Sequence, residues 1–480
     1  MQRAMTVGEL CRMREEEGAA PLDGMWYLGC TTTHIYCRPT CTAHVNPQNL
    51  TVFPSAAAAE AAGFRPCLRC HPENAPRMPV VAGDAAAALA SLIEENLAAP
   101  DCLDAALAAL HLDAQGAAET GARFAALFGT TPQHYLETAR RLLAKALLSG
   151  AGLPPSAVST ACGYANQREL ERDFAEHYRL GLDRLAPRRG PAAYTLALGY
   201  RKPYRFDLLM DFLAFRAIQG VEVVEGGRYA RTCAFGGDVG WVTVEDNPEK
   251  SRILLSVSDS LVPHIARIAA KARRLFDTDC APRDVTAALG GFHAQVDGRF
   301  DIAGVRLPCS FGALEMAVRA ILGQQITVKA ANTLAGRVAA RFGIPCPTPI
   351  DGLEAVFPPP AAFASDEAVN ALGEMGIIGR RAQAIRLLAE KLGDGSLELN
   401  VGCSEQESLH ALVALDGIGP WTAHYLLMRA CHHTDGFPAA DYGVKLAFPG
   451  LTPKEIERAS QAWRPYRSYA VMSLWCAPHA

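Results

Sequence analysis

Hydrophobic and polar positions repeat with different periods in different parts of the chain. Apolar residues recur every three or four positions over 83–97 and 131–150, which predicts two amphipathic helices. From residue 221 the period shortens to two and β-branched residues become frequent, which predicts strands. Gly226 and Gly227 interrupt this alternation and predict a hairpin turn. Two further strand candidates follow at 241–246 and 251–259.

Helical periodicity returns beside and after these strands. Residues 207–218 and 261–276 are helix candidates, so the middle of the chain is expected to be α+β. Residues 314–343 form a long helical run, which we expect to divide into two helices. The stretch 185–195 is rich in Arg, Pro and Gly and predicts a linker.

The length of the chain predicts several domains. Its 480 residues are too many for one ordinary core, because a domain holds roughly 100–200 residues. The hydrophobic content of 50% and the charged content of 20% exclude a wholly disordered chain. We therefore expect a multidomain α+β protein with domains at 1–78, 84–188, 192–300 and 301–480.

Charge and hydropathy narrow the expected environment. The formal net charge of −4 argues against nucleic-acid binding through bulk basicity, although it permits a local basic face. No apolar run reaches the roughly 18 residues of a transmembrane helix, and the N-terminus lacks the apolar core of a signal peptide. These features predict a cytoplasmic protein without a membrane partner.

Four of the fifteen cysteines form a cluster, with the spacing Cys37-x3-Cys41 and Cys67-x2-Cys70. An odd number of cysteines in a cytosolic chain argues against a disulfide framework. Two close pairs supply the four thiolates that tetrahedral Zn²⁺ prefers. The spacing leaves open a zinc knuckle that only stabilises a small domain. Because four cysteines complete such a site, two nearby histidines are not expected to be ligands: His34 and His71.

The sequence segments around these cysteines indicate a more specific function. WYLGCTTTHIYCRPTC and GFRPCLRCHPE resemble the N-terminal domain of the Ada alkylation-response family. The resemblance implies that the four cysteines bind Zn²⁺ and that Cys37 irreversibly accepts a methyl group from a methylphosphotriester in DNA. A zinc-bound thiolate stays deprotonated and nucleophilic at neutral pH. Methylation removes negative charge, so it should strengthen DNA binding and convert damage into a transcriptional signal.

Residues 152–187 resemble the second helix-turn-helix of AraC-type regulators. In this alignment 157–161 lie on the first helix, 162–164 form the turn and 166–178 form the recognition helix. The implied DNA contacts are Gln167, Arg168 and Arg172. An ordinary helical hairpin is the alternative.

The preceding helical pair, within 103–129, is expected to bind DNA weakly. The second helix of this pair, which would be its recognition helix, has a single basic residue, Arg123, and contains Gly116 and Gly121. Two glycines in a helix cost on the order of 1–2 kcal/mol.

The segment LDGIGPWTAHYLL predicts a helix that ends at Leu415, a tight turn and a new helix near Pro420. The turn is Gly417-Ile418-Gly419. Glycines permit positive φ and expose backbone N–H groups, which can bind phosphate at a helix N-terminus. A plain helix hairpin is the alternative.

Twenty-four residues after Gly417 comes Asp441, and this spacing resembles the helix-hairpin-helix–GPD pattern of DNA glycosylases. Three blocks, at 194–231, 318–328 and 463–475, resemble AlkA-type 3-methyladenine DNA glycosylases. The resemblance implies an antiparallel α+β domain similar to half of the TATA-binding protein, followed by an all-α glycosylase core. It also assigns Trp421, Tyr425 and Trp475 to the base pocket.

The expected chemistry can be argued from charge. Breaking an N-glycosidic bond builds positive charge at the sugar C1′, and a carboxylate at about 4 Å stabilises it by about 4 kcal/mol at an effective dielectric of about 20. Asp441 is the predicted source of that charge. N3- and N7-methylated purines are cationic and leave without strong acid catalysis, once the nucleotide is flipped from the duplex. Gln325 stands where some relatives insert a leucine wedge.

Three absences refine the expected activity. Glycosylases that also nick the strand carry a lysine in the hairpin, where this chain has Trp421, so we predict a monofunctional enzyme that leaves an abasic site. Iron–sulfur relatives end in four cysteines, of which only Cys476 is present. The Pro-Cys-His-Arg motif of the Ada methyltransferase domain is absent, so O6-methylguanine repair is not expected.

These observations predict a monomeric DNA-3-methyladenine glycosylase of type II, fused to a zinc methyl acceptor and a regulator. Its expected partner is double-stranded DNA. The rival hypothesis is a methylation-activated transcription regulator whose glycosylase half only binds DNA. Asp441 discriminates between them, because only the enzyme needs its carboxylate.

Overall fold

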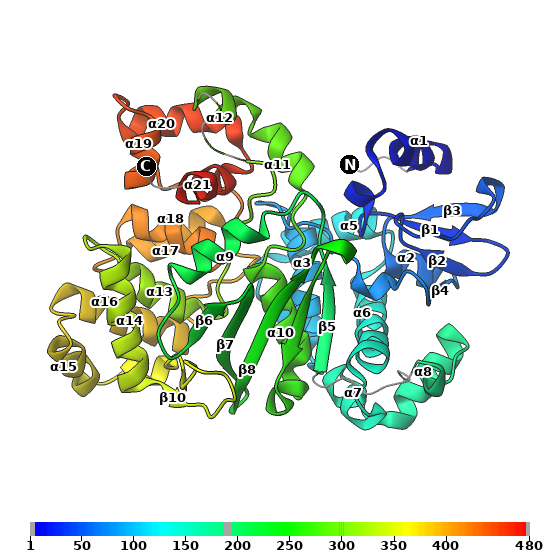
Figure 1. Ribbon diagram of the computed structural model, residues 1–480, viewed down its shortest axis with the longest axis horizontal. Coiled ribbons are helices and arrows are strands. Elements are labelled where there is room, and N and C mark those ends of the chain that lie inside the picture. The colour runs from blue at the N-terminus through cyan, green and yellow to red at the C-terminus, as the bar shows by residue number, and fades with distance from the viewer. Residues whose placement is uncertain (1–4, 186–193, 297, 299, 301, 477–480) are drawn as a thin grey trace.

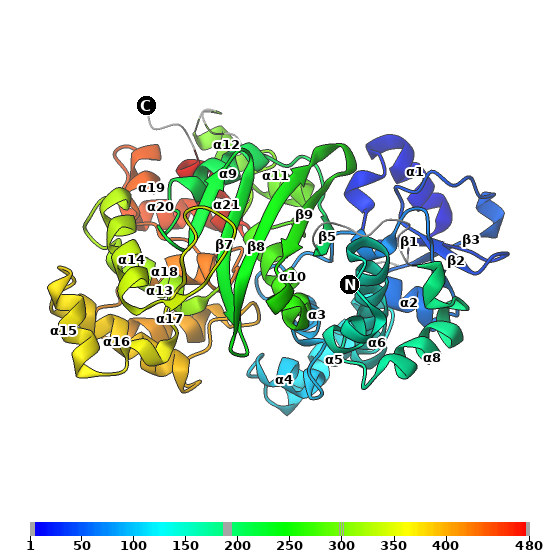
Figure 2. The ribbon, with the colours of Figure 1, turned by 60° about the horizontal axis from the view of Figure 1, so that its bottom comes forward.

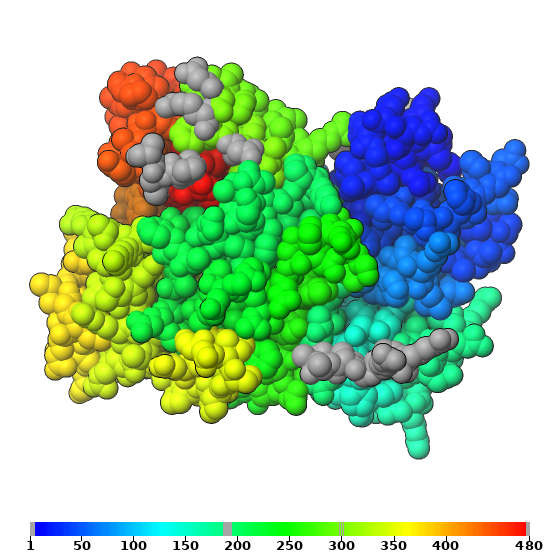
Figure 3. All heavy atoms as spheres, in the orientation of Figure 1, coloured from blue at the N-terminus to red at the C-terminus, as the bar shows by residue number. Residues whose placement is uncertain are grey.

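The computed structural model describes residues 5–185, 194–296, 298, 300 and 302–476. Figure 1 shows the N-terminal unit at one end, a twisted sheet in the middle and the C-terminal helices at the other end. The space-filling view in Figure 3 shows these three parts in the same order across one face of the molecule. Most of the predicted linker, 186–193, lies outside the described residues.

The N-terminal unit is a small sheet flanked by short helices. Helix α1 (Val7–Glu17) precedes it, and α2 (Ala56–Ala61) packs against it. The strand order is β3-β1-β2-β4, and β2 pairs with β4 in parallel. The strands are β1 (Tyr27–Cys30), β2 (Ile35–Cys37), β3 (Leu50–Phe53) and β4 (Arg65–Pro66).

An all-helical unit follows, and it contains both helices predicted from its periodicity. These are α3 (Ala85–Asn96) and α6 (Pro132–Ala146), which continues as a π-turn to Ala151. The glycines at 116 and 121 do not interrupt α5. Buried Phe124 and Phe128 pack this helix against Tyr135 of α6, with ring centroids 5.5 and 5.0 Å apart. The remaining helices are α4 (Cys102–Ala108), α5 (Ala114–Phe128), α7 (Pro155–Ala161) and α8 (Gln167–Tyr178).

The middle of the chain forms a five-stranded antiparallel sheet in the order β5-β9-β8-β7-β6. The predicted hairpin is confirmed: Gly226 and Gly227 link β6 to β7 with φ of 59° and 76°, which few other residues adopt. Helix α10 (Ile265–Leu275) starts later than predicted, because residues 259–264 form a 3₁₀ turn containing Pro263. The strands are β5 (Tyr194–Gly199), β6 (Glu222–Glu225), β7 (Arg228–Phe235), β8 (Asp238–Asn247) and β9 (Arg252–Val257).

Over residues 302–476 the C-terminal part is helical except for one short ribbon that the sequence did not predict, β10 (Ile344–Pro345) with β11 (Ala355–Val356). The long helical run divides as expected into α13 (Ala313–Leu322) and α14 (Val328–Phe342). Gln325 lies in the break with φ of 61°. The next helices are α15 (Asp366–Glu374), α16 (Arg380–Gly393), α17 (Glu405–Val413) and α18 (Pro420–Arg429).

Packing in this part does not follow chain order. The ring of Phe292, in α12 (Gly290–Gln295), lies 5.1 Å from that of Trp463, so residues before the C-terminal core share a cluster with its last helices. Helices α13 to α18 form a separate apolar cluster. Asp441 lies where these two groups meet. The first cluster also includes α7, α8, α10 and strands of the central sheet. Its further helices are α9 (Phe206–Ala214), α11 (Pro282–Ala288), α19 (Tyr442–Ala447), α20 (Pro453–Ala459) and α21 (Arg467–Trp475).

A buried carboxylate joins the N-terminal unit to the helical unit. Glu60, on α2, accepts hydrogen bonds from Tyr36 at 2.9 Å, Tyr178 at 2.8 Å and Arg141 at 2.8 Å. Tyr36 precedes the first clustered cysteine, and Tyr178 ends α8. Burial raises the pKa of Glu60, and the guanidinium of Arg141 opposes that rise. The contact fixes the orientation of α8 relative to the cysteine cluster.

A buried arginine joins the N-terminal unit to the central sheet. Arg201 donates to the backbone oxygens of Asp23 at 3.0 Å, Arg77 at 2.8 Å and Asp279 at 2.8 Å. Helices α3 and α10 also lie side by side (Figure 2), and Arg274 of α10 pairs with Glu95 of α3. These contacts hold the first two units against the sheet.

Candidate active site and metal centre

The local fold brings the four clustered cysteines together. Cys37 ends β2, and the parallel partner strand leads directly to Cys67, whose N–H donates to the carbonyl of Tyr36 at 3.0 Å. All four sulfurs lie within 4.8 Å of one another. Tetrahedral zinc with Zn–S bonds of about 2.3 Å needs sulfurs about 3.8 Å apart, so this donor set fits the ion. The predicted four-cysteine zinc site is confirmed.

Backbone N–H groups support the sulfurs. Arg38 N–H donates to Cys70 Sγ at 3.4 Å, and Arg69 N–H donates to Cys67 Sγ at 3.3 Å. Such donors favour thiolate and orient metal ligands.

The two nearby histidines have other partners. The ring of His34 lies 5.2 Å from that of Phe64, and His71 Nδ1 is 2.9 Å from Glu73 Oε1. Neither belongs to the four-residue metal-binding group, which agrees with the prediction that cysteines alone complete the site.

Asp441 is buried at the start of α19, with 8% of its surface exposed. Its Oδ1 accepts hydrogen bonds from Gly443 N–H at 2.9 Å and Val444 N–H at 3.2 Å. Two indole N–H groups also converge on it: Trp475 Nε1 lies 3.0 Å from Oδ1, and Trp421 Nε1 lies 2.9 Å from Oδ2. Four donors thus fix the carboxylate in one orientation, facing Trp421.

The three predicted pocket aromatics lie together above this carboxylate. Ring centroids are 5.3 Å apart for Trp421 and Tyr425, which are stacked, and 5.7 Å apart for Tyr425 and Trp475. A base inserted between two rings needs about 7 Å, twice the contact distance of carbon atoms. An entering base must therefore stack on an outer ring face or displace one ring.

The hairpin between α17 and α18 has the predicted turn, with one correction. Gly417 has the expected positive φ of 88°, whereas Gly419 is extended with φ of −92° and begins α18 as its N-cap residue. Gln324 holds the turn by donating to Gly417 O at 3.0 Å and Thr422 Oγ1 at 3.1 Å.

A hollow of about 340 Å³ opens beside this turn. Its lining combines backbone N–H groups, two arginines and amide side chains, which is the composition expected of a phosphate-binding surface. Ile378, at its edge, is 67% exposed. The lining residues are Gln324, Gln325, Ile378, Arg380, Arg381, Gly417, Ile418 and Gly419.

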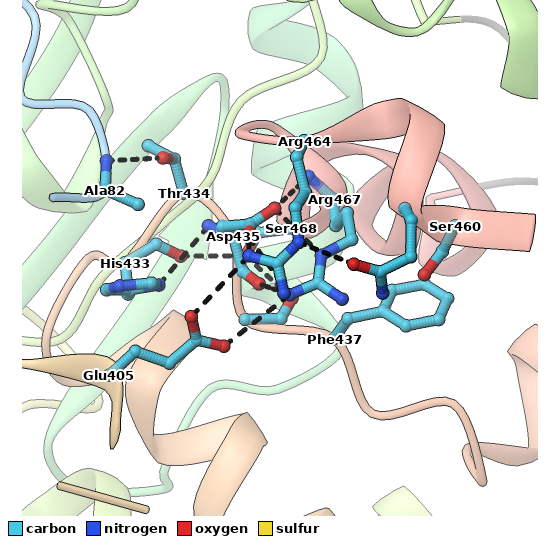
Figure 4. Close-up of polar contacts among 12 residues, drawn as sticks. Ala82, Glu405, His433, Thr434, Asp435, Phe437, Ser460, Arg464, Arg467 and Ser468 are labelled. Atoms are coloured by element: carbon cyan, nitrogen blue, oxygen red, sulfur yellow. Dashed lines mark hydrogen bonds and ion pairs between the residues drawn. The ribbon is translucent and has the colours of Figure 1, made fainter. Parts of the chain in front are cut away.

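The loop that carries Asp441 is anchored by a buried ion-pair network (Figure 4). Asp435 is 1% exposed, and its Oδ1 accepts a hydrogen bond from Arg467 Nε at 2.9 Å. Arg464 pairs with the same carboxylate. Ser468 Oγ donates to the backbone of Gly436 at 2.9 Å. The network ties the loop to α21, the helix that also supplies Trp475.

We expect Arg467→Met to lower the melting temperature of the protein. The substitution leaves the carboxylate of Asp435 buried beside fewer donors, and breaking a buried pair costs about 3–5 kcal/mol. Differential scanning calorimetry measures the shift. The exposed Arg228, replaced in the same way, is the control and should change the melting temperature little. Equal melting temperatures for both variants would show that the network does not hold the loop.

The second helix of the predicted helix-turn-helix is confirmed as α8, with Asn166 as its N-cap residue. Gln167, Arg168 and Arg172 are exposed on it, although Gln167 also donates to Glu171 at 2.7 Å. Arg123 of the preceding pair is tied to Asp84 at 2.9 Å. The DNA contacts of both pairs stay predictions.

Several residues near the site were not predicted from the sequence. Gln324 and Arg380 reach the hairpin only through long-range packing, which no local pattern signals. Asp435 did have a signal, because it is a second acid in the Gly/Pro loop before Asp441.

Family models match four consecutive parts of the chain. They are described as the metal binding domain of Ada (residues 14–73), a helix-turn-helix domain (118–183), the AlkA N-terminal domain (195–312) and an HhH-GPD superfamily base excision DNA repair protein (318–463). Within the described residues no helix is long and apolar enough to span a membrane.

Three curated relatives show how these parts are combined. A probable bifunctional transcriptional activator/DNA repair enzyme AlkA of Mycobacterium tuberculosis is 33% identical over 97% of this chain and 96% of its own length. DNA-3-methyladenine glycosylase 2 of Escherichia coli is 36% identical over 59% of this chain and 96% of its own length. The bifunctional transcriptional activator/DNA repair enzyme Ada of Escherichia coli is 48% identical over 11% of this chain and 15% of its own length.

Proposed function

The chain belongs to the family of bifunctional Ada–AlkA DNA repair proteins, and on that premise we propose that Asp441 catalyses release of alkylated purines from double-stranded DNA. The chain is thus a DNA glycosylase, a hydrolase, with an Ada-type zinc domain and a helix-turn-helix. The observation that carries the assignment of Asp441 is its buried carboxylate, held by two indoles of the predicted base pocket.

The proposed reaction begins when the bond between C1′ and the base nitrogen breaks. The bonding electron pair leaves with the base, and positive charge develops at the sugar. The carboxylate of Asp441 stabilises that charge without reorganising, because Trp421 and Trp475 already fix both of its oxygens. A water molecule then adds to C1′ and releases a proton to bulk solvent, which leaves an abasic site.

The aromatic side chains bind the leaving base. Trp421, Tyr425 and Trp475 are only partly buried, so ring faces remain open to a flipped nucleotide. Stacking contributes about 1–3 kcal/mol per base, and a cationic base strengthens it. Gln325 is exposed at the break between α13 and α14. Its side chain is proposed to fill the gap that the flipped nucleotide leaves in the DNA base stack.

The phosphate backbone is the proposed ligand of the hairpin. Gly417, Ile418 and Gly419 are the proposed contacts. The N–H of Ile418 donates to Leu415 O at 3.1 Å, so the N–H groups of Gly417 and Gly419 would bind phosphate beside Arg381 and Arg380, the latter also paired with Asp416. These contacts position the duplex without reading its sequence.

Incubation with a duplex that contains one 7-methylguanine tests this function. We expect free base and an abasic site that breaks only after alkali, because Trp421 stands where strand-nicking relatives have their lysine. Intact DNA after incubation would favour the rival, a regulator whose glycosylase half only binds DNA. Breaks before alkali would contradict the monofunctional assignment.

A second function follows from the four-cysteine centre. The zinc ion, when bound, keeps the four thiolates deprotonated and nucleophilic at neutral pH. Cys37 is partly exposed at the end of β2, so its sulfur can reach a methyl carbon. The S–C bond forms while the C–O bond of the methylphosphotriester breaks, and that electron pair stays on the phosphate oxygen.

We expect DNA with methylphosphotriesters to add one methyl group to Cys37. Mass spectrometry of peptides from the treated protein identifies the modified cysteine, and Cys11, outside the cluster, serves as internal reference. Methylation at another member of the cluster would reassign the acceptor. An unmodified protein would leave only the structural role of zinc.

The remaining proposals concern regulation, domain limits and setting. Gln167, Arg168 and Arg172 are proposed to contact promoter DNA from α8. The proposed domain limits are those expected from the sequence: 1–78, 84–188, 192–300 and 301–480. All fifteen cysteines lie in the described part of the chain and none is in a disulfide, which supports a reducing, cytoplasmic setting. A monomer is proposed.

A further inference from the structure

One end of the central sheet lies against the unit that bears the four cysteines. Gly199, the last residue of β5, pairs with Arg252, the first residue of β9. The backbone of Asn74 approaches Gly199 so closely that a Cβ there would lie 2.3 Å from the carbonyl oxygen of Asn74. The chain just after Cys70 therefore covers this end of the sheet. Figure 2 shows β5 and β9 as the strands of the sheet nearest to the N-terminal unit.

The side chain of Arg252 leaves the sheet toward this unit. Directly opposed residues of an antiparallel pair project from the same face, so Arg252 shares the face on which Asn74 contacts Gly199. The next residue, Ile253, is buried in the core on the opposite face. Burial lowers the pKa of Arg252, and the positive charge of nearby Arg38, which directly follows Cys37, lowers it further.

Arg252 lacks a partner for its charge. Within the part of the chain that the structure describes, its guanidinium has no carboxylate or hydrogen-bond acceptor, and its Nε is buried. Neighbouring Arg38, in contrast, pairs with Asp23. A half-buried cationic donor without an acceptor is costly. Arg252 is therefore suited to an anion that the protein itself does not supply.

Two lysines extend this positive charge into solvent. The pairing of β5 with β9 continues by one residue, because the N–H of Tyr200 donates to the carbonyl of Ser251 at 3.0 Å. Lys202 and Lys250 flank this last bond, and both are exposed. Together with Arg252 they form a basic sheet end, which consists of Lys202, Lys250 and Arg252.

We propose that the basic sheet end binds the DNA phosphates that flank the methylated phosphate presented to Cys37. The inference rests on the methyl-transfer function proposed above. A methylphosphotriester is neutral, and a zinc ion with four thiolates keeps a net negative charge, so neither attracts the DNA strand. The guanidinium of Arg252 offers paired N–H donors that match two phosphate oxygens, and the lysines attract the backbone as point charges. The central sheet thereby completes the DNA surface of the methyl acceptor.

Methyl uptake by Cys37 from two donors tests the proposal. One donor is a duplex with a methylphosphotriester, and the other is methyl iodide, which carries no phosphate and measures the reactivity of the thiolate alone. In the full chain, Arg252→Met should lower the second-order rate constant with the duplex about tenfold at low salt. The rate constant with methyl iodide should stay within about twofold. The logarithm of the duplex rate constant should also fall less steeply with the logarithm of salt concentration, by about one in slope.

Arg228→Met is the matched control, because Arg228 is exposed on β7, two strands away from β9 in the same sheet. It should react at wild-type rates with both donors. A wild-type rate and salt dependence of Arg252→Met with the duplex would overturn the proposal. An equal loss with both donors would also overturn it, since Arg252 would then act on the reactivity of Cys37 and not on DNA.

A second variant keeps the test open if Arg252→Met does not fold. Lys202→Met combined with Lys250→Met replaces two exposed side chains and should slow uptake from the duplex but not from methyl iodide. An unchanged duplex rate in this double variant would overturn the proposal. The proposed function fails separately, because a wild-type protein without that function takes no methyl group from the duplex although methyl iodide still modifies Cys37.

Discussion

Asp441→Asn should lower the single-turnover rate of base release about a thousandfold. The substitution removes the charge that offsets the developing cation at C1′, and about 4 kcal/mol of lost stabilisation corresponds to that factor. DNA affinity should change little, because the hairpin and its arginines are untouched. Rates are measured with enzyme in excess over a duplex that contains one methylated purine.

The control is Asp394→Asn, at an exposed aspartate remote from the aromatic rings. It should release base at the wild-type rate. Asparagine at 441 still caps α19, but one of the two indoles loses its carboxylate acceptor, so calorimetry must accompany the assay. A folded Asp441→Asn variant with an unchanged rate would show that the carboxylate is not catalytic.

Removal of zinc should unfold the N-terminal unit and abolish methyl uptake. This unit is small, and structural zinc contributes an apparent 10–16 kcal/mol of binding free energy, about the stability of a whole domain. Base release should persist, because the Asp441 site shares no residue with the four-cysteine centre. Chelation followed by limited proteolysis locates the unfolded segment.

Two substitutions of the same kind separate zinc binding from the general loss of a thiol. Cys41→Ser removes a ligand and should give the behaviour of the chelated protein, whereas Cys11→Ser lies outside the cluster and should retain zinc. Metal analysis of the purified variants provides the readout. Retention of zinc and methyl uptake by Cys41→Ser would mean that this cysteine is not a ligand.

Local pattern predicted most of the elements. Periodicity identified α3, α6, α13 and α14, because each buries one apolar face, and paired glycines identified the β6–β7 turn. The ribbon of β10 and β11 was missed because two-residue strands carry no period. The junctions at Glu60 and Arg201 were missed because they join residues distant in sequence.

The site was predicted residue by residue but not its internal contacts. The spacing after Gly417 identified Asp441, and the resemblance to AlkA-type glycosylases identified Trp421 and Trp475; the structure brings the three together. It did not predict that the indoles hydrogen-bond to the carboxylate, because that depends on how α18 and α21 meet.

The central claim is that the carboxylate of Asp441 stabilises positive charge at the anomeric position. The most direct test compares affinity for two duplexes, one with a cationic pyrrolidine in place of the damaged nucleotide and one with a neutral tetrahydrofuran. A mimic of the transition state should bind tighter than its neutral counterpart. We expect the wild-type protein to prefer the cationic duplex and Asp441→Asn to lose most of that preference. An equal preference in both proteins would contradict the claim.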